Sequence, residues 1–298
     1  LIYGFSESTN FSLISENIVA TDFGNIFGIV FILVGLSFKI SAVPFHMWAP
    51  DVYEGSPTSV TLFFAIVPKI AAVTVFIRFL YVPFFGLIDQ WQSIIIFLAL
   101  ASMIFGAVAA IGQKNLKRLI AYSSIGHMGY ALAGLATVSN SGIQSSIIYI
   151  TIYFVMNLGI FSCLFMLKRN NKYYENIEDL SGLSKNHPII SLSLLILLFS
   201  LAGIPPMAGF FAKFYIFMSV IEKSMYFLAV VGLISTVISS FYYLRIIKII
   251  YFDKALESFD KENFLGLKLT LAISTILTLL YFIYPSGLIN LISQINVI

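Results

Sequence analysis

Four titratable side chains lie inside apolar stretches of this sequence: Lys39, Lys69, Lys213 and His127. A charged amine near the centre of a lipid bilayer costs about 2.5–3.5 kcal/mol on insertion scales, so such residues usually face a bundle interior and serve an ion or proton path. Apolar surroundings also favour the neutral form of an amine, which brings proton exchange within reach of neutral pH. The three lysines are therefore candidate proton carriers.

Small residues flank two of these lysines along a helix. Lys69 lies at the middle of the apolar stretch 57–82, with Ala65 and Ala72 one turn away on either side. Lys39 has a glycine and an alanine at the same offsets. Small neighbours allow close helix approach or a file of water beside the amine. The alternative is that each lysine extends along its stem to the membrane surface.

Helix-breaking residues accompany two of the lysines. Pro44 follows Lys39 and can open a helix there, because proline lacks the N–H and clashes with the preceding turn. The stretch 188–221 is too long for one straight crossing and is interrupted by Gly203, Pro205, Pro206 and Gly209. We therefore expect two half-helices, 188–203 and 207–221, with Lys213 on the second. Broken helices at bilayer depth mark ion sites in transporters, although a kink used only for packing is the alternative.

His127 belongs to a polar stripe on the stretch 116–138. Ser123, His127, Tyr130 and Gly134 recur at helical spacing, and the titration range of histidine suits a proton relay. A structural histidine, hydrogen-bonded to a neighbouring helix, is an equal alternative. A single intramembrane histidine and a single cysteine argue against a haem or iron–sulfur site, and we expect no metal site.

The composition places the chain in a membrane. Of its 298 residues 59% are hydrophobic and 10% are charged, which excludes a soluble globule, and the net charge of +3 does not imply nucleic acid as a partner. The apolar stretches lack the alternation of barrel strands, so we predict an all-α polytopic transmembrane helix bundle that forms a single membrane domain, 1–298. We expect about eight spans, two of them broken: 25–45, 57–82, 90–112, 116–138, 142–167, 188–221, 225–252 and 264–284.

The segments between the spans are more polar. We expect residues 1–24 to form a short polar loop, and Pro50, Gly55 and Pro57 predict a turn after the first span that also carries His46, Asp51 and Glu54. This turn is expected to cap span ends and contact a neighbouring subunit, with a direct proton-transfer role for Asp51 or Glu54 as the alternative. The loop 168–187 mixes both charges and is assigned no chemistry.

Basic residues predict the orientation of the chain. They collect in the loops after the third, fifth and seventh spans, which alternate with loops nearly free of them. Because Lys and Arg concentrate in cytoplasmic loops, we place these loops in the cytoplasm and residue 1 outside. The absence of an initiating methionine and of a basic region before the first apolar stretch leads us to expect that the sequence begins inside a longer protein.

Three runs carry a family resemblance: KISAVPFHMWAPDVYEGSPTSVT, QKNLKRLIAYSSIGHMGY and LAGIPPMAGFFAKFY. Together, in this order and with fitting gaps, they resemble the antiporter-like membrane subunits of NADH:quinone oxidoreductase, respiratory complex I, and among them subunit N. The resemblance covers residues 30–250. It implies a fourteen-helix fold, of which this chain would be the last eight helices, with two inverted five-helix repeats and broken seventh and twelfth helices.

The resemblance also implies a function. The family's lysines of helices seven, eight and twelve are held to conduct protons along a hydrated axis, and Lys39, Lys69 and Lys213 match them. A glutamate that pairs with the first would lie before residue 1. The chain would then be a proton-translocating subunit of an enzyme complex, with no redox chemistry or cofactor of its own. NAD, FMN, iron–sulfur clusters and quinone are expected in other subunits.

Two alternative functions remain open at the level of sequence. A subunit of a multisubunit sodium/proton antiporter shares this fold, but a sodium site prefers oxygen ligands over buried amines. A purely structural scaffold is the second alternative. The expected partners are other membrane subunits, the lipid bilayer and protons. The expected location is the bacterial cytoplasmic membrane, with the mitochondrial inner membrane as the alternative.

Overall fold

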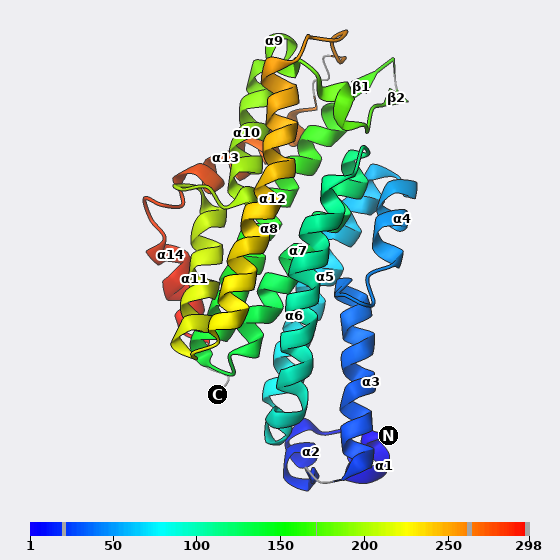
Figure 1. Cartoon of the computed structure of the whole chain (residues 1–298), viewed down its shortest axis with the longest axis vertical. Helices are drawn as coiled ribbons and strands as arrows, with labels where there is room; N and C mark the ends of the chain where they lie inside the picture. The colour runs from blue at the N-terminus through cyan, green and yellow to red at the C-terminus, as the bar shows by residue number, and fades with distance from the viewer. Residues whose placement is uncertain (20–21, 171, 261–263, 296–298) are drawn as a thin grey trace.

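The computed structural model describes residues 1–19, 22–170, 172–260 and 264–295, which form a bundle of long helices (Figure 1). Two short 3₁₀ turns and a two-stranded ribbon complete the described elements. The helices are α1 Ile2–Ser6, α2 Phe11–Asn17, α3 Phe23–Ile40, α4 Trp48–Gly55, α5 Thr58–Tyr81, α6 Ile88–Ile111, α7 Leu116–Ala136, α8 Asn140–Met166, α9 Leu183–Asn186, α10 Pro188–Ala202, α11 Ala208–Glu222, α12 Tyr226–Phe252, α13 Leu265–Leu280 and α14 Ser286–Ser293; the strands are β1 Lys168–Arg169 and β2 Lys172–Tyr173.

The helices are the expected membrane spans. Within the described residues, α3, α5, α6, α8 and α12 are long and apolar enough to cross a bilayer, and α10 and α13 are shorter apolar helices. Helix α7 is more polar, but its 21 residues rise about 31 Å at 1.5 Å each, enough to span. The prediction of an all-α polytopic bundle is confirmed, with boundaries within a few residues of those expected.

Both predicted breaks are present. The sixth span divides into α10 and α11, separated by residues 203–207. In the first expected span, 25–45, helix α3 ends at Ile40 before Pro44, and α4 begins beyond that span, after residues 41–47. A cis peptide bond precedes a proline in each break, at Pro44 and at Pro206. The two broken segments run in opposite directions through the bundle (Figure 1), as an inverted arrangement requires.

Two predictions about the polar segments were wrong. The turn expected around Pro50 is helix α4, because Pro50 is the third residue of that helix, where a missing N–H costs no intrahelical hydrogen bond. The polar loop expected over residues 1–24 contains α1 and α2. The side chain of Asn10 caps α2 by accepting from the Ser12 N–H at 3.0 Å. Residues 20–21 of that stretch lie outside the described residues.

The basic loops gather at one end of the bundle, opposite to α1 and α2 (Figure 1). We call this the basic end. The Leu116 N–H donates to the Glu175 carbonyl at 2.7 Å, and the Asp260 N–H donates to the Lys168 carbonyl at 2.8 Å. The loops after α6, α8 and α12 are thereby joined, which confirms that alternate connections share a side. Lys261, counted with these basic loops, lies outside the described residues.

Helix α7 lies at the centre of the bundle and is buried along almost its whole length. Its close packing against α6 depends on glycine, because a Cβ on Gly106 would lie 2.4 Å from the Gly126 backbone nitrogen. Glycine pairs of this kind let transmembrane helices approach closely. The polar stripe of α7 is therefore held inside protein, between α5, α8, α11 and α12.

Candidate functional site

Lys69 is buried at the middle of α5, with 1% of its surface exposed. Its Nζ donates a hydrogen bond to Ser124 Oγ on α7 at 2.6 Å and lies 5.6 Å from the centre of the Tyr53 ring. Pro68, immediately before it, lies inside the helix and cannot donate to the carbonyl of Phe64. The Phe64 carbonyl therefore lacks its usual helical donor one turn before the amine.

Lys213 is buried on α11, with 4% of its surface exposed. Its Nζ donates to the carbonyl oxygens of Leu201 at 3.1 Å and Ala202 at 3.2 Å, which are the last two residues of α10. The final carbonyls of a helix have no intrahelical partner and carry partial negative charge, so a cation is favoured there. Gly203 ends α10 with a φ of 87°, and a Cβ on it would lie 3.1 Å from Lys213 Cδ. The break thus creates the site that the amine fills.

His127 lies between tyrosines from two other helices and is 4% exposed. Its Nδ1 is 2.7 Å from the Tyr149 hydroxyl of α8, and its Nε2 is 3.1 Å from the Tyr243 hydroxyl of α12. The Tyr243 hydroxyl also contacts Ser123 Oγ of α7. Both ring nitrogens of the histidine are therefore in contact with groups that donate and accept protons.

Each buried lysine has one contact with α7. Ser124 contacts Lys69, and the ring of Tyr130 lies 5.1 Å from Lys213 Nζ. His127 lies between them in sequence, three residues from each, so the three positions follow neighbouring turns of one helix. A small internal cavity, here called cavity A, opens beside this stripe. Its polar lining comprises Ser123, His127, Tyr130, Lys213, Ser235, Ser239 and Tyr242.

The structure brings together three of the four predicted residues. Lys69, His127 and Lys213 converge around α7, whereas Lys39 is exposed in the last turn of α3. The ion pairs found among the described residues lie at the basic end and involve neither Lys69 nor Lys213. Both buried amines donate their hydrogen bonds to neutral oxygen atoms.

The polar residues of α4 and its preceding loop take other roles. Arg118 of α7 pairs with Asp51 at 2.7 Å and with Glu54 at 2.8 Å. The ring of His46 packs against Phe105, with 4.4 Å between ring centres. These contacts fasten α4 to α7 and α6.

Several polar contacts of the site were missed by the sequence analysis. Tyr149 and Tyr243 complete the hydrogen bonds of His127, and Ser124 completes that of Lys69. Lys117 is 3% exposed in the first turn of α7, where its Nζ pairs with Glu175 at 2.8 Å. The sequence offered no specific signal for these contacts, because serine and tyrosine are common in membrane helices.

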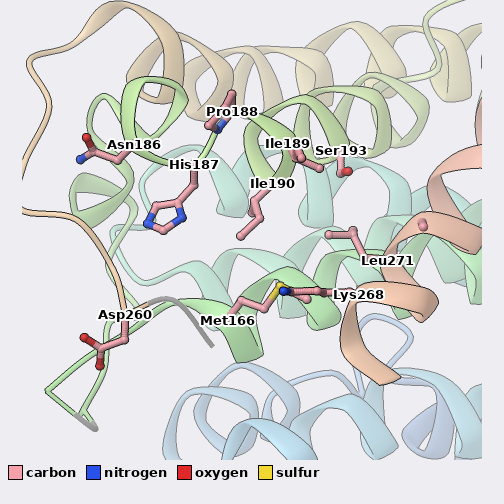
Figure 2. Close-up of a pocket in the computed structure, with 11 residues that line it drawn as sticks. Met166, Asn186, His187, Pro188, Ile189, Ile190, Ser193, Asp260, Lys268 and Leu271 are labelled. Carbon is pink, nitrogen blue, oxygen red and sulfur yellow. The ribbon is translucent and has the colours of Figure 1, made fainter. Parts of the chain in front are cut away.

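The described residues include no group of three or more His, Cys, Asp or Glu placed to hold a metal ion. A larger groove lies away from the buried amines, between the first turns of α10 and α13 (Figure 2). His187, Ile190, Lys268 and Leu271 are among its lining residues, and none of its residues lines cavity A.

The class of protein that these observations define is a polytopic membrane helix bundle, with buried lysines on broken and intact helices around a polar central helix. The chain belongs to the family described as NADH:quinone oxidoreductase/Mrp antiporter, transmembrane, whose model matches residues 1–239. The resemblance found in the sequence is confirmed.

Curated relatives of the chain include two bacterial proteins named NADH-quinone oxidoreductase subunit N. The one from Pelagibacter ubique is 74% identical over 298 residues, which is 100% of this chain and 63% of that protein. The one from Parvibaculum lavamentivorans is 54% identical over 291 residues, covering 97% of this chain and 60% of that protein. The chain therefore spans about three-fifths of the length of these relatives.

Solved structures of the same fold come from several membrane complexes. A chain of respiratory complex I from Thermus thermophilus superposes with a TM-score of 0.81 at 28% identity, covering 97% of this chain and 62% of that chain. A chain of the Mrp complex from Dietzia gives a TM-score of 0.88 at 20% identity, covering 99% and 63%, and this likeness shows the fold alone.

Proposed function

We propose that this chain is the proton-translocating part of a membrane-arm subunit of NADH:quinone oxidoreductase. In this proposal it couples electron transfer from NADH to quinone, carried out in other subunits, to proton movement across the membrane. The observation that supports it most is the convergence of two buried amines and an imidazole on one helix. The names of the curated relatives support the choice of complex.

The proposed role of Lys69 and Lys213 is to hold and release protons inside the bilayer. A protonated Lys69 donates to Ser124 Oγ, and a protonated Lys213 donates to the carbonyls at the end of α10. The partners in these hydrogen bonds are uncharged, so loss of the proton leaves no buried carboxylate without a counter-charge. Each amine is therefore suited to alternate between charged and neutral forms.

His127 is proposed to relay protons between the two amines. Its contacts with Tyr149 and Tyr243 allow one ring nitrogen to accept a proton while the other releases one. Water in cavity A would complete the connection to Lys213. Lys39 is proposed as a third carrier, paired with a carboxylate from a segment or subunit outside the described residues.

The proposed setting is a multisubunit complex in a bacterial cytoplasmic membrane. Other membrane subunits of the complex would cover the exposed apolar faces of the bundle, and long-range changes of charge along the membrane arm would drive the lysines. NAD, FMN, iron–sulfur clusters and quinone would bind elsewhere in that complex. A sodium/proton antiporter is a less suitable function, because sodium prefers sites built from several oxygen ligands.

The test compares proton pumping with electron transfer in membranes that contain the complete complex. We expect Lys69→Ala and Lys213→Ala to remove most NADH-driven proton uptake, while NADH oxidation with an artificial electron acceptor shows that the complex still assembles. Lys172→Ala, at an exposed lysine of β2, is the matched control and should leave pumping unchanged. Unchanged proton-to-electron ratios in both buried-lysine variants would contradict the proposal.

A further inference from the structure

The hydroxyl of Tyr243 occupies a branch point in the polar interior. It contacts His127 Nε2 at 3.1 Å on one side and Ser123 Oγ on the other. Tyr243 is 1% exposed and its ring packs against Tyr242, with 4.4 Å between ring centres. The hydrogen bonds described above for Lys69 and Lys213 are made with other residues, so the contacts of Tyr243 are not needed to hold either amine in place.

A second cavity, here called cavity B, begins where the first one ends. Ser123 lines both cavities, and Tyr243 and Asn157 supply the remaining polar lining of cavity B. The other walls are apolar and extend toward the basic end: Leu116, Leu119, Ile120, Ile160, Leu180, Leu194, Leu198, Leu201 and Ile246. Leu116 is the first residue of α7, and Leu180 belongs to the loop joined to it by hydrogen bonds. Cavity B therefore points from the polar interior toward the basic loops.

The other direction toward the basic end, along α4 and α5, carries fixed charge. Lys117 Nζ donates to the Ser56 carbonyl at 2.8 Å and pairs with Glu175, which also accepts from Thr58 Oγ1 at 3.3 Å. Arg118 lies beside this group. The donors of both cations are committed to ion pairs, Lys117 with Glu175 and Arg118 with Asp51 and Glu54, so this direction is closed by a fixed network of charged groups. Cavity B, in contrast, presents no charged side chain among its described lining residues.

We propose that protons pass between the basic end and the buried amines through cavity B, Ser123 and the Tyr243 hydroxyl. This inference rests on the proposed function, and it names the route by which protons would reach the buried amines from the basic end. A hydroxyl can accept a proton from Ser123 or water while its own proton passes to His127, so no charge accumulates on the tyrosine. The leucine-lined cavity would stay dry most of the time and wet intermittently, which limits leakage, as in hydrophobic gates of channels.

The first test removes only the hydroxyl. Tyr243→Phe in the complete complex should lower the number of protons moved per NADH oxidised while electron transfer to an artificial acceptor is retained. Tyr281→Phe is the matched control, because Tyr281 packs against Phe211 outside this group, with 5.8 Å between ring centres. If Lys69→Ala reduces pumping and Tyr243→Phe does not, the proposed function stands and the route through Tyr243 is wrong.

The second test asks which side of the membrane reaches cavity B, and it does not depend on pumping. Ile246→Cys places a thiol in the cavity wall, one turn of α12 from Tyr243. A small water-soluble thiol reagent should label this cysteine when added to the basic-loop side, and not from the opposite side. Ile95→Cys, buried on α6 away from both cavities, is the control and should resist labelling, as should the native buried Cys163. Because the cavity wets only intermittently, labelling should be slow; a rate at position 246 no faster than at position 95, or labelling only from the opposite side, would overturn the proposal.

Discussion

Lys69 and Lys213 each need hydrogen-bond acceptors inside the bundle, and the two side chains find them in different places. One buried amine donates to a serine hydroxyl and the other to backbone carbonyls at a helix end. Both partners are neutral, which distinguishes these amines from the ion-paired Lys117 at the basic end. A lysine paired with a carboxylate is held in its charged form, whereas one paired with neutral oxygen atoms can exchange its proton. The two kinds of environment separate the proposed proton carriers, Lys69 and Lys213, from the ion-paired Lys117.

Lys117 supplies a stability prediction at the residue scale. Lys117→Met keeps most of the side-chain volume but leaves Glu175, 28% exposed at its side chain, without its ion-pair partner. We expect the folded chain to lose about 1–3 kcal/mol, because a partly buried group loses its hydrogen-bonded partner. The thermal unfolding temperature of the purified complex in detergent should fall.

Lys114→Met is the control for this measurement, since Lys114 is exposed on the loop just before α7. An unfolding temperature for Lys117→Met equal to that of Lys114→Met would show that the pair contributes nothing measurable.

The lysines could be found from sequence and their partners could not. A charged residue inside an apolar stretch is visible in a single sequence because its burial has a large cost. Tyr149 and Tyr243 give no such signal, since tyrosine is common in membrane helices and its hydroxyl matters only once α8 and α12 pack on α7.

At the scale of elements, the breaks were the most predictable feature and the short helices the least. Proline and glycine clusters act locally, so the division into α10 and α11 followed from residues 203–209 alone. Helix α4 was read as a turn because Pro50 and Gly55 favour turns, yet the first turn of a helix tolerates proline. The packing of α4 against α7, through Arg118, favours the helix.

Gly209 supplies the prediction at this scale. It is the second residue of α11 and lies beside the end of α10, where its N–H donates to Ser200 Oγ at 2.8 Å. A Cβ at this position would lie 2.0 Å from the Ser200 carbonyl oxygen, which is backbone and cannot move aside. Gly209→Ala should therefore displace α11 from α10 and destabilise the chain by about 1–3 kcal/mol, the usual cost of overpacking.

The displacement should also carry Lys213 away from its carbonyl partners, so pumping should fall together with the unfolding temperature. Gly266→Ala on α13 is the control, because no atom lies within 4 Å of the added Cβ. A Gly209→Ala protein with unchanged stability and pumping would mean that the two half-helices are not held at the spacing described.

At the scale of the whole molecule, hydropathy and charge predicted the number of spans and the side of each loop. Both properties act over entire segments and survive errors of a few residues at each boundary. The way the basic loops join was not predictable, since the hydrogen bonds between residues 112–116, 168–177 and 253–260 are made by backbone groups. The exposure of Lys39 was also unexpected, because sequence alone indicates depth along a helix and not the direction a side chain faces.

The central claim is that Lys69, His127 and Lys213 form one proton path through the interior of the bundle. The most direct measurement is a high-resolution experimental map of the chain in its assembled complex, with ordered water resolved between these side chains. The account predicts water in cavity A that links the imidazole to Lys213 Nζ, with both amines remaining inside the bundle. Dry, close-packed side chains between the three groups, or amines that extend to the membrane surface, would contradict it.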